Sequence, residues 1–278
     1  MKPNKIVWIG IVLLIIVSVA IILYCTRIQA QSSLQTNSKS EYKPIPKLEI
    51  PCNTTHIQRQ FYAFEYIEEH EQSLWVAYML TSRTQTTIHK RSNSFYPDPL
   101  VATQTATNAD YSKSGYDKGH LAPAADMNWS AQAMKESFYF SNMSPQLPAF
   151  NRGIWKTLEE QVRVWAQKFD TLYVVTGPIL ESELPTIGVN KVSIPKFFYK
   201  AIVVYSKARI QGIAFILPHA ASGNSIFSYA VPIDSVETKI QRDLNCALPQ
   251  SIENSIDLFK FGWINSIFLE SKSIPYFS

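Results

Sequence analysis

The strongest constraint on the fold lies in residues 116–168. This stretch opens with the sequence YDKGHLAP, in which His120 follows a glycine at the edge of a turn. It closes with a segment that begins at Asn151 and reads NRGIW. Asn is a favoured helix N-cap, so we predict a helix that starts at Asn151. Its apolar residues recur at helical spacing, and they are Ile154, Trp155, Leu158, Val162, Trp165 and Phe169.

Runs typical of β-strands flank this stretch on both sides. Two runs before it are joined by the charged loop Glu68–Glu71, which predicts a hairpin. Residues 83–115 are polar, and prolines on both sides of Asp98 favour a rigid loop. We therefore predict an α+β fold with a central, largely antiparallel sheet. The predicted strands are Gln60–Tyr66, Ser73–Leu80, Leu172–Val175, Phe197–Tyr205, Ile210–Leu217 and Ser228–Ile233, and two further predicted helices are Ser130–Glu136 and Ile252–Phe268.

The N-terminus carries a long apolar run. Residues 6–24 are 19 residues without a charge, and Lys2 and Lys5 precede them. A bilayer-spanning helix needs about 20 apolar residues, and basic residues before it favour a cytoplasmic N-terminus. We predict a transmembrane helix, with the rest of the chain membrane-anchored and extracytoplasmic. The alternative is a cleaved signal sequence and a secreted or periplasmic protein, although the apolar core of a signal is usually about 7–15 residues.

These features divide the chain into three parts. Residues 1–30 are the anchor or signal sequence, 31–51 a polar tether with two prolines, and 52–278 one globular domain. Cys52 and Cys246 lie at the two ends of that domain. They could form a disulfide in an oxidising compartment, and two free thiols are the alternative. The net charge of +4 permits a polyanionic partner without requiring one.

Several residue types in the central stretch suit hydrolysis with a hard metal ion. An unperturbed His has a pKa of about 6.5, so His120 can accept a proton near neutral pH. The amide oxygen of Asn151 is a ligand type that Mg²⁺ accepts. Glu159 and Arg163 are four residues apart and share one helix face. The alternatives are a structural turn histidine, a helix cap and an ordinary surface ion pair.

The sequence Asp117-Lys118-Gly119-His120, followed 31 residues after the histidine by Asn151, resembles the DNA/RNA non-specific endonuclease family. Members of that family carry a ββα-metal finger. The resemblance covers about residues 58–245 and includes other landmarks in the same order. These are Trp75–Tyr78, Arg91 with Phe95 and Asp98, Ser141–Gln146, Thr176–Pro178 and Ile194–Lys196.

The resemblance implies a role for each candidate residue. His120 would be the general base, Asn151 the metal ligand, Glu159 the acid that orients water around the metal, and Arg163 a phosphate ligand. The implied ion is Mg²⁺, with Mn²⁺ as a substitute. Asp117 would hydrogen-bond within the turn and help to fix the His120 ring.

Three further positions complete the implied site. Arg91 would reach the scissile phosphate, which its planar guanidinium can grip at two oxygens. Asn142 would position His120 or the water. Lys118 stands where the family has Arg, so the charge is kept while the bidentate geometry is lost. The catalytic residues implied are thus His120, Arg91, Asn142, Glu159 and Arg163, with Lys118, Arg91 and Arg163 binding substrate and Asn151 binding metal.

The activity that the resemblance implies is Mg²⁺-dependent cleavage of DNA and RNA without sequence preference, with 5′-phosphate products. The expected partners are nucleic acids and, through residues 6–24, a membrane. Two alternatives stay open. One is an extracytoplasmic nucleic-acid-binding protein of weak catalytic activity, as in DNA uptake. The other is a phosphodiesterase that acts on small substrates.

Overall fold

The structure is a computed structural model that describes residue 51 and residues 54–85, 87–169, 171–205 and 210–244. The predicted membrane anchor, the tether, the two cysteines at 52 and 246 and the predicted helix at 252–268 lie outside these residues. Within the described ranges, no helix combines the length and the apolar character that crossing a membrane requires.

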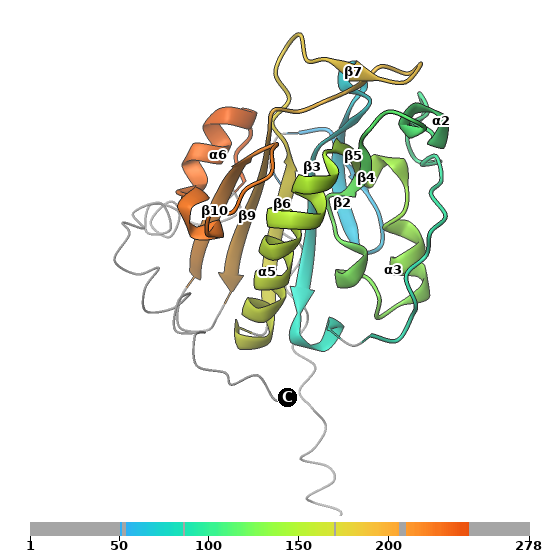
Figure 1. Cartoon of the computed structure of the whole chain (residues 1–278). Coiled ribbons are helices and arrows are strands. Elements are labelled where there is room, and N and C mark those ends of the chain that lie inside the picture. The colour runs from blue at the N-terminus through green and yellow to red at the C-terminus, as the bar shows by residue number, and fades with distance from the viewer. Residues whose placement is uncertain (1–50, 52–53, 86, 170, 206–209, 245–278) are drawn as a thin grey trace, which may run out of the picture. The chain divides into compact units, whose positions relative to one another are not determined.

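The predicted antiparallel sheet is confirmed (Figure 1). It has seven strands in the order β1-β2-β3-β6-β9-β10-β11, and each neighbouring pair is antiparallel. The long predicted runs form its central strands. The strands are β1 (Ile57–Gln58), β2 (Tyr62–Ile67), β3 (Gln72–Thr81), β6 (Thr171–Pro178), β9 (Phe197–Tyr205), β10 (Ile210–Pro218) and β11 (Ala230–Val231).

Both faces of this sheet are covered, which explains the nearly continuous apolar runs in its strands. On β3, Val76 and Tyr78 belong to the core beneath helix α5 (Lys156–Phe169), whereas Trp75 and Ala77 belong to the core beneath α6 (Ile233–Ile240). In Figure 1, α5 runs along the sheet against β3, β6 and β9. The apolar stripe predicted for this helix is therefore the face that packs on the sheet.

A second, smaller hairpin holds the DKGH sequence. Strand β4 (Asp117–His120) pairs with β5 (Met143–Gln146), and His120 lies opposite Met143. A Cβ on Gly119 would lie 2.2 Å from the buried Gln146 side chain, so a larger residue here would require that side chain to move. The remaining short elements are α2 (Asn108–Tyr111), α3 (Ala131–Glu136), β7 (Thr186–Ile187), β8 (Val192–Ser193) and the 3₁₀ turns η1 (Glu68–His70), η2 (Ser82–Thr84), η3 (Ala124–Asp126), η4 (Phe140–Asn142) and η6 (Ile226–Tyr229).

The prediction that Asn151 is a helix N-cap is wrong. The chain turns helical earlier, in α4 (Pro148–Phe150), continues through a π-helical turn η5 (Asn151–Trp155), and then enters α5. Pro148 suits the first helical position because its missing N–H has no intrahelical partner there. Asn151 itself has helical angles, φ −57° and ψ −45°. The backbone of Gly153 is non-helical, with φ −103° and ψ −116°, so the chain is kinked between two helical segments here.

The predicted strand Ser228–Ile233 is also largely wrong. Only Ala230–Val231 pair with the sheet, because Pro232 cannot donate a ladder hydrogen bond and stands at the N-cap of α6. Helix α6 was not predicted, although its buried residues Ile233, Val236 and Ile240 follow a helical spacing.

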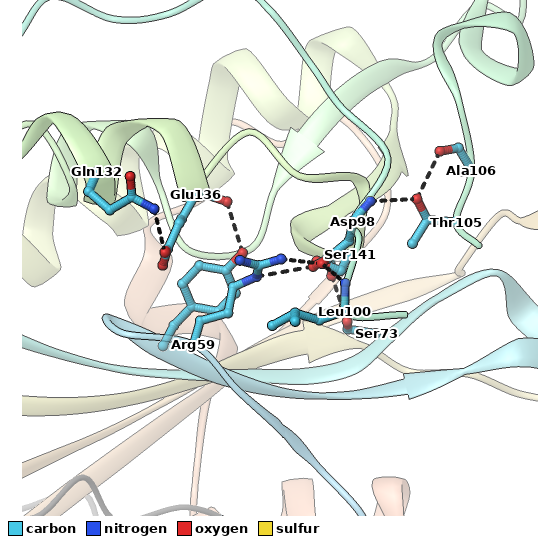
Figure 2. Close-up of polar contacts among 10 residues, drawn as sticks. Arg59, Ser73, Asp98, Leu100, Thr105, Ala106, Gln132, Glu136 and Ser141 are labelled. Carbon is cyan, nitrogen blue, oxygen red and sulfur yellow. Dashed lines mark hydrogen bonds and ion pairs between the residues drawn. The ribbon is translucent and has the colours of Figure 1, made fainter. Parts of the chain in front are cut away.

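A buried carboxylate fixes the loop that precedes the small hairpin (Figure 2). Asp98 forms an ion pair with Arg59, with Nε at 3.1 Å from Oδ2 and Nη2 on Oδ1. The same carboxylate accepts hydrogen bonds from the Ser141 hydroxyl and from the Leu100 amide at 2.8 Å. Ser73 on β3 donates to the Ser141 carbonyl at 2.5 Å. One network thus joins the start of the sheet, the Asp98 loop and the segment that leads into β5.

Candidate active site

His120 ends β4 in an aromatic pocket. Its ring packs edge-on against Phe138, with centroids 4.8 Å apart, and lies 5.8 Å from Phe95. One ring nitrogen donates to the backbone carbonyl of Lys118. Nε2 is buried and has no hydrogen-bond partner among the described residues, so the donor is assigned as Nδ1. The neutral ring therefore presents a free lone pair at Nε2, which is the form that a general base requires.

The surroundings of His120 change the pKa of its ring. Burial and the charge of Arg91 together lower the pKa of His120 to about 3. The ring is therefore uncharged throughout the neutral range. The guanidinium of Arg91 lies over Phe138, 5.3 Å from the ring centre. A phosphate bound by this guanidinium would offset its charge and raise the pKa of His120, which makes the ring a stronger base when substrate is present.

Asn142 fixes the chain immediately after the histidine. Its side chain is fully buried. Its Oδ1 accepts from the Ala122 amide at 2.8 Å, and its Nδ2 donates to the carbonyls of Ala122 and Ser137 at 2.9 and 2.8 Å. Because backbone groups occupy both ends of the amide, this side chain can act on the site by holding the turn that follows His120.

Asn151 is held by the first residue of β4. Its Nδ2 donates to Asp117 Oδ2 at 2.9 Å, and Arg152 binds both oxygens of the same carboxylate at 2.9 and 2.7 Å. Burial acts to raise the pKa of Asp117, but the hydrogen bonds from Arg152 and Asn151 outweigh it and lower that pKa. Asp117 thus bonds to the helical segment that follows β5, and not within its own turn as predicted.

This contact leaves the Asn151 oxygen available. The carboxylate can only accept, so the amide nitrogen faces it and Oδ1 points elsewhere, without a partner among the described residues. Mg²⁺ takes oxygen ligands, keeps several waters and is often held by one or two protein groups. No group of three or more His, Cys, Asp or Glu side chains in the described part of the chain could hold a metal. Asn151 therefore fits a Mg²⁺ ion that has one amide oxygen as its protein ligand and keeps several waters.

Arg163 is positioned by a residue that the sequence did not single out. Its Nη1 lies 2.9 Å from Asp126 Oδ1, and Tyr78 donates to Asp126 Oδ2 at 2.9 Å. Asp126 is buried in η3, six residues after His120 in the chain. Sequence spacing gave no indication of this contact, because it joins three separate elements.

Glu159 and Arg163 do not form the surface ion pair that was the alternative interpretation of their spacing, because Arg163 is bonded to Asp126. On α5, the ion pair at i,i+4 spacing joins Lys156 and Glu160 at 3.5 Å. Burial raises the pKa of Glu159 to about 7, against the charges of Lys200, Arg163 and Arg91.

Several of the candidate residues interact with Arg91 or lie on β4. Arg91 interacts electrostatically with both His120 and Glu159. Lys118 lies two residues before His120 on the same strand and therefore on the same face. Its Nζ donates to Asn108 Oδ1 at 2.9 Å and lies 4.3 Å from the centre of the Phe95 ring, which also contacts His120. The site thus combines a neutral base, a half-buried acid and several cations.

Comparison with known proteins identifies the family. The sequence profile of the DNA/RNA non-specific endonucleases matches residues 43–251. The chain belongs to this family. It is 34% identical to human mitochondrial endonuclease G over 194 residues, which are 64% of this chain and 65% of that protein. It is 31% identical to a nuclease of Nostoc sp. over 219 residues, 74% of this chain and 78% of that one.

A frog relative and a solved structure agree with this assignment. The chain is 32% identical over 219 residues to the mitochondrial nuclease EXOG of Xenopus laevis, and these cover 71% of this chain and 60% of that protein. The match thus spans less than two thirds of the human and frog proteins. In a crystal structure of an EndoG/EndoGI complex, a chain with 29% identity superposes with a TM-score of 0.68, over 73% of this chain and 90% of the other.

Proposed function

We propose that this endonuclease-family chain is a Mg²⁺-dependent enzyme that hydrolyses phosphodiester bonds in DNA and RNA without sequence preference. The observation that carries the proposal is the buried Nε2 of His120, held in its acceptor form with no partner among the described residues. The names of the relatives support the reaction class, since they are called endonuclease or nuclease.

The proposed reaction begins with proton transfer. As water adds to phosphorus, Nε2 of His120 takes its proton, while the bond from Nδ1 to the Lys118 carbonyl keeps the ring in place. Arg91 binds the phosphate through its guanidinium, and the negative charge of that phosphate stabilises the protonated ring. Glu159, in its ionised form, accepts a hydrogen bond from the water and so orients it.

A bound Mg²⁺ would be held by Oδ1 of Asn151 and would supply positive charge for the transition state and the leaving oxygen. Asp117 supports this ligand by fixing the amide nitrogen. Lys118 and Arg163 add positive charge for the phosphates on either side of the cleaved bond. Because Lys118 offers a point charge and not a planar fork, we expect it to hold phosphate without setting its orientation.

We also propose that residues 6–24 anchor the protein in a membrane, with the catalytic domain on the extracytoplasmic side. The length of the uncharged run and the lysines before it support this location.

The test uses the full chain in mild detergent with supercoiled plasmid and with single-stranded RNA. We expect both polymers to be degraded with Mg²⁺ and to stay intact with EDTA. A plasmid that is retarded on a gel but not cut would instead indicate a nucleic-acid-binding protein. Hydrolysis of small phosphodiesters without cleavage of either polymer would indicate the small-substrate alternative. Both of these results contradict the proposal.

A further inference from the structure

Lys200 lies in the middle of β9, on the sheet face that α5 covers. It is paired across the sheet with Thr176 of β6, and its side chain is fully buried. Its Nζ donates to the Thr176 hydroxyl oxygen at 3.1 Å and lies 4.7 Å from the centre of the Trp155 ring. Lysine is almost never fully buried unless its charge is paired. The Thr176 hydroxyl and the Trp155 ring are both uncharged, so a carboxylate is required to balance the charge of the ammonium.

The ammonium interacts electrostatically with two carboxylates, those of Glu159 and Asp126. Glu159 lies one helical turn after Trp155, whose ring contacts the ammonium, and therefore on the same helix face. Each oxygen of Asp126 already accepts a hydrogen bond, one from Arg163 and one from Tyr78. Glu159 has no hydrogen bond or ion pair to another described residue. The lysine has three N–H donors and the threonine hydroxyl uses one. Glu159 is therefore the carboxylate whose charge is left to balance that of Lys200.

The electrostatic coupling between the two groups is reciprocal. Burial raises the pKa of Glu159, and Lys200 is the strongest of the charges that oppose this effect. Burial lowers the pKa of Lys200, and Glu159 is the strongest of the charges that oppose it. Asp126 and Arg163 face both groups, and Arg91 faces Glu159 from the side of His120. Each of the two thus favours the charged form of the other.

We propose that Lys200 is a positioning residue for the hydrolysis, which from beneath α5 stabilises the charged carboxylate of Glu159 on the helix face that also carries Arg163. The inference rests on the proposed function, in which Glu159 acts as a carboxylate. Lys200 is fully buried, so it touches neither water nor phosphate and acts through Glu159.

The first experiment measures the pKa of Glu159 in the full chain by carbon-13 NMR, without metal or substrate. The Glu159→Gln variant assigns the signal. Lys200→Met removes a positive charge, so it raises the pKa of Glu159 by about 1–3 units. Lys239→Met is the matched control, because Lys239 is exposed on α6 at the other face of the sheet. This control leaves the pKa unchanged.

The second experiment records kcat/KM for plasmid cleavage against pH. Ionised Glu159 is lost as pH falls through its pKa, so a higher pKa moves the acidic limb of the profile to higher pH. In Lys200→Met we expect this shift to match the NMR shift, with recovery of the rate at alkaline pH. In the Glu159→Gln background, Lys200→Met causes no shift.

Other outcomes decide against the inference. An unchanged Glu159 titration in Lys200→Met, with a loss of rate that is equal at all pH values, would show that Lys200 only supports the fold. If Lys200→Met does not fold, Glu159→Gln replaces it, because reciprocity requires the pKa of Lys200 to fall in that variant. An inactive wild-type protein would overturn the proposed function, whereas the titrations would still decide whether the two groups are coupled.

Discussion

His120→Ala is expected to lower kcat/KM for plasmid cleavage by about 10²–10⁴-fold, the usual contribution of a general base. The substitution removes the free Nε2 acceptor, whereas the Asn142 side chain continues to hold the turn that follows. Binding of Mg²⁺ and DNA should persist, because Asn151 and the cationic side chains are unchanged. Initial rates with supercoiled plasmid measure the loss, and a gel-shift assay measures the retained affinity.

A matched control is His56→Ala, which removes an exposed histidine at the start of the described chain. It should cleave at the wild-type rate. Circular dichroism should show that both variants are folded. Equal activity of His120→Ala and wild type would remove the role of His120 as a base.

Asp98→Ala is expected to lower the free energy of unfolding by about 3–5 kcal/mol, the cost of leaving one member of a buried ion pair without its partner. The substitution leaves the Arg59 guanidinium buried and uncompensated, and it also removes the acceptor for Ser141 and Leu100 (Figure 2). Urea denaturation followed by circular dichroism measures the change.

Glu181→Ala provides the comparison for that loss, since Glu181 pairs with Lys196 on the surface at 3.1 Å. An exposed pair of this kind contributes about 0–1 kcal/mol. The double variant Arg59→Met/Asp98→Leu should recover part of the stability, because it removes both charges together. A loss in Asp98→Ala no larger than that in Glu181→Ala would mean that the network is not stabilising.

The strands of the sheet could be predicted because burial on both faces leaves a simple apolar signal. β9 was predicted with its observed bounds, and the alternation along it places Lys200 on the same face as Phe198 and Ile202. That alternation was the one sequence signal for a buried lysine. Whether Lys200 lies near Glu159 depends on how α5 crosses β9, which local sequence does not specify.

Local patterns were less informative at the ends of elements and for long-range contacts. The helix start was misplaced because Asn151 is a good N-cap by type, whereas Pro148 begins the helix three residues earlier. The contact of Asp126 with Arg163 joins residues 37 apart. The Asp117–Asn151 bond joins residues 34 apart. Neither contact follows from periodicity. The family resemblance identified Asn151 as the implied metal ligand, but it gave no indication that Asp117 holds the Asn151 side chain.

The central claim is that a neutral histidine and an amide-held metal ion act together in one site. Its most direct test is the initial rate of plasmid cleavage against Mg²⁺ concentration for wild type, His120→Ala and Asn151→Ala. We predict that Asn151→Ala requires much more Mg²⁺ for half-maximal rate, whereas His120→Ala keeps the wild-type requirement and loses its maximal rate. An Asn151→Ala enzyme whose Mg²⁺ dependence matches that of wild type would contradict the account.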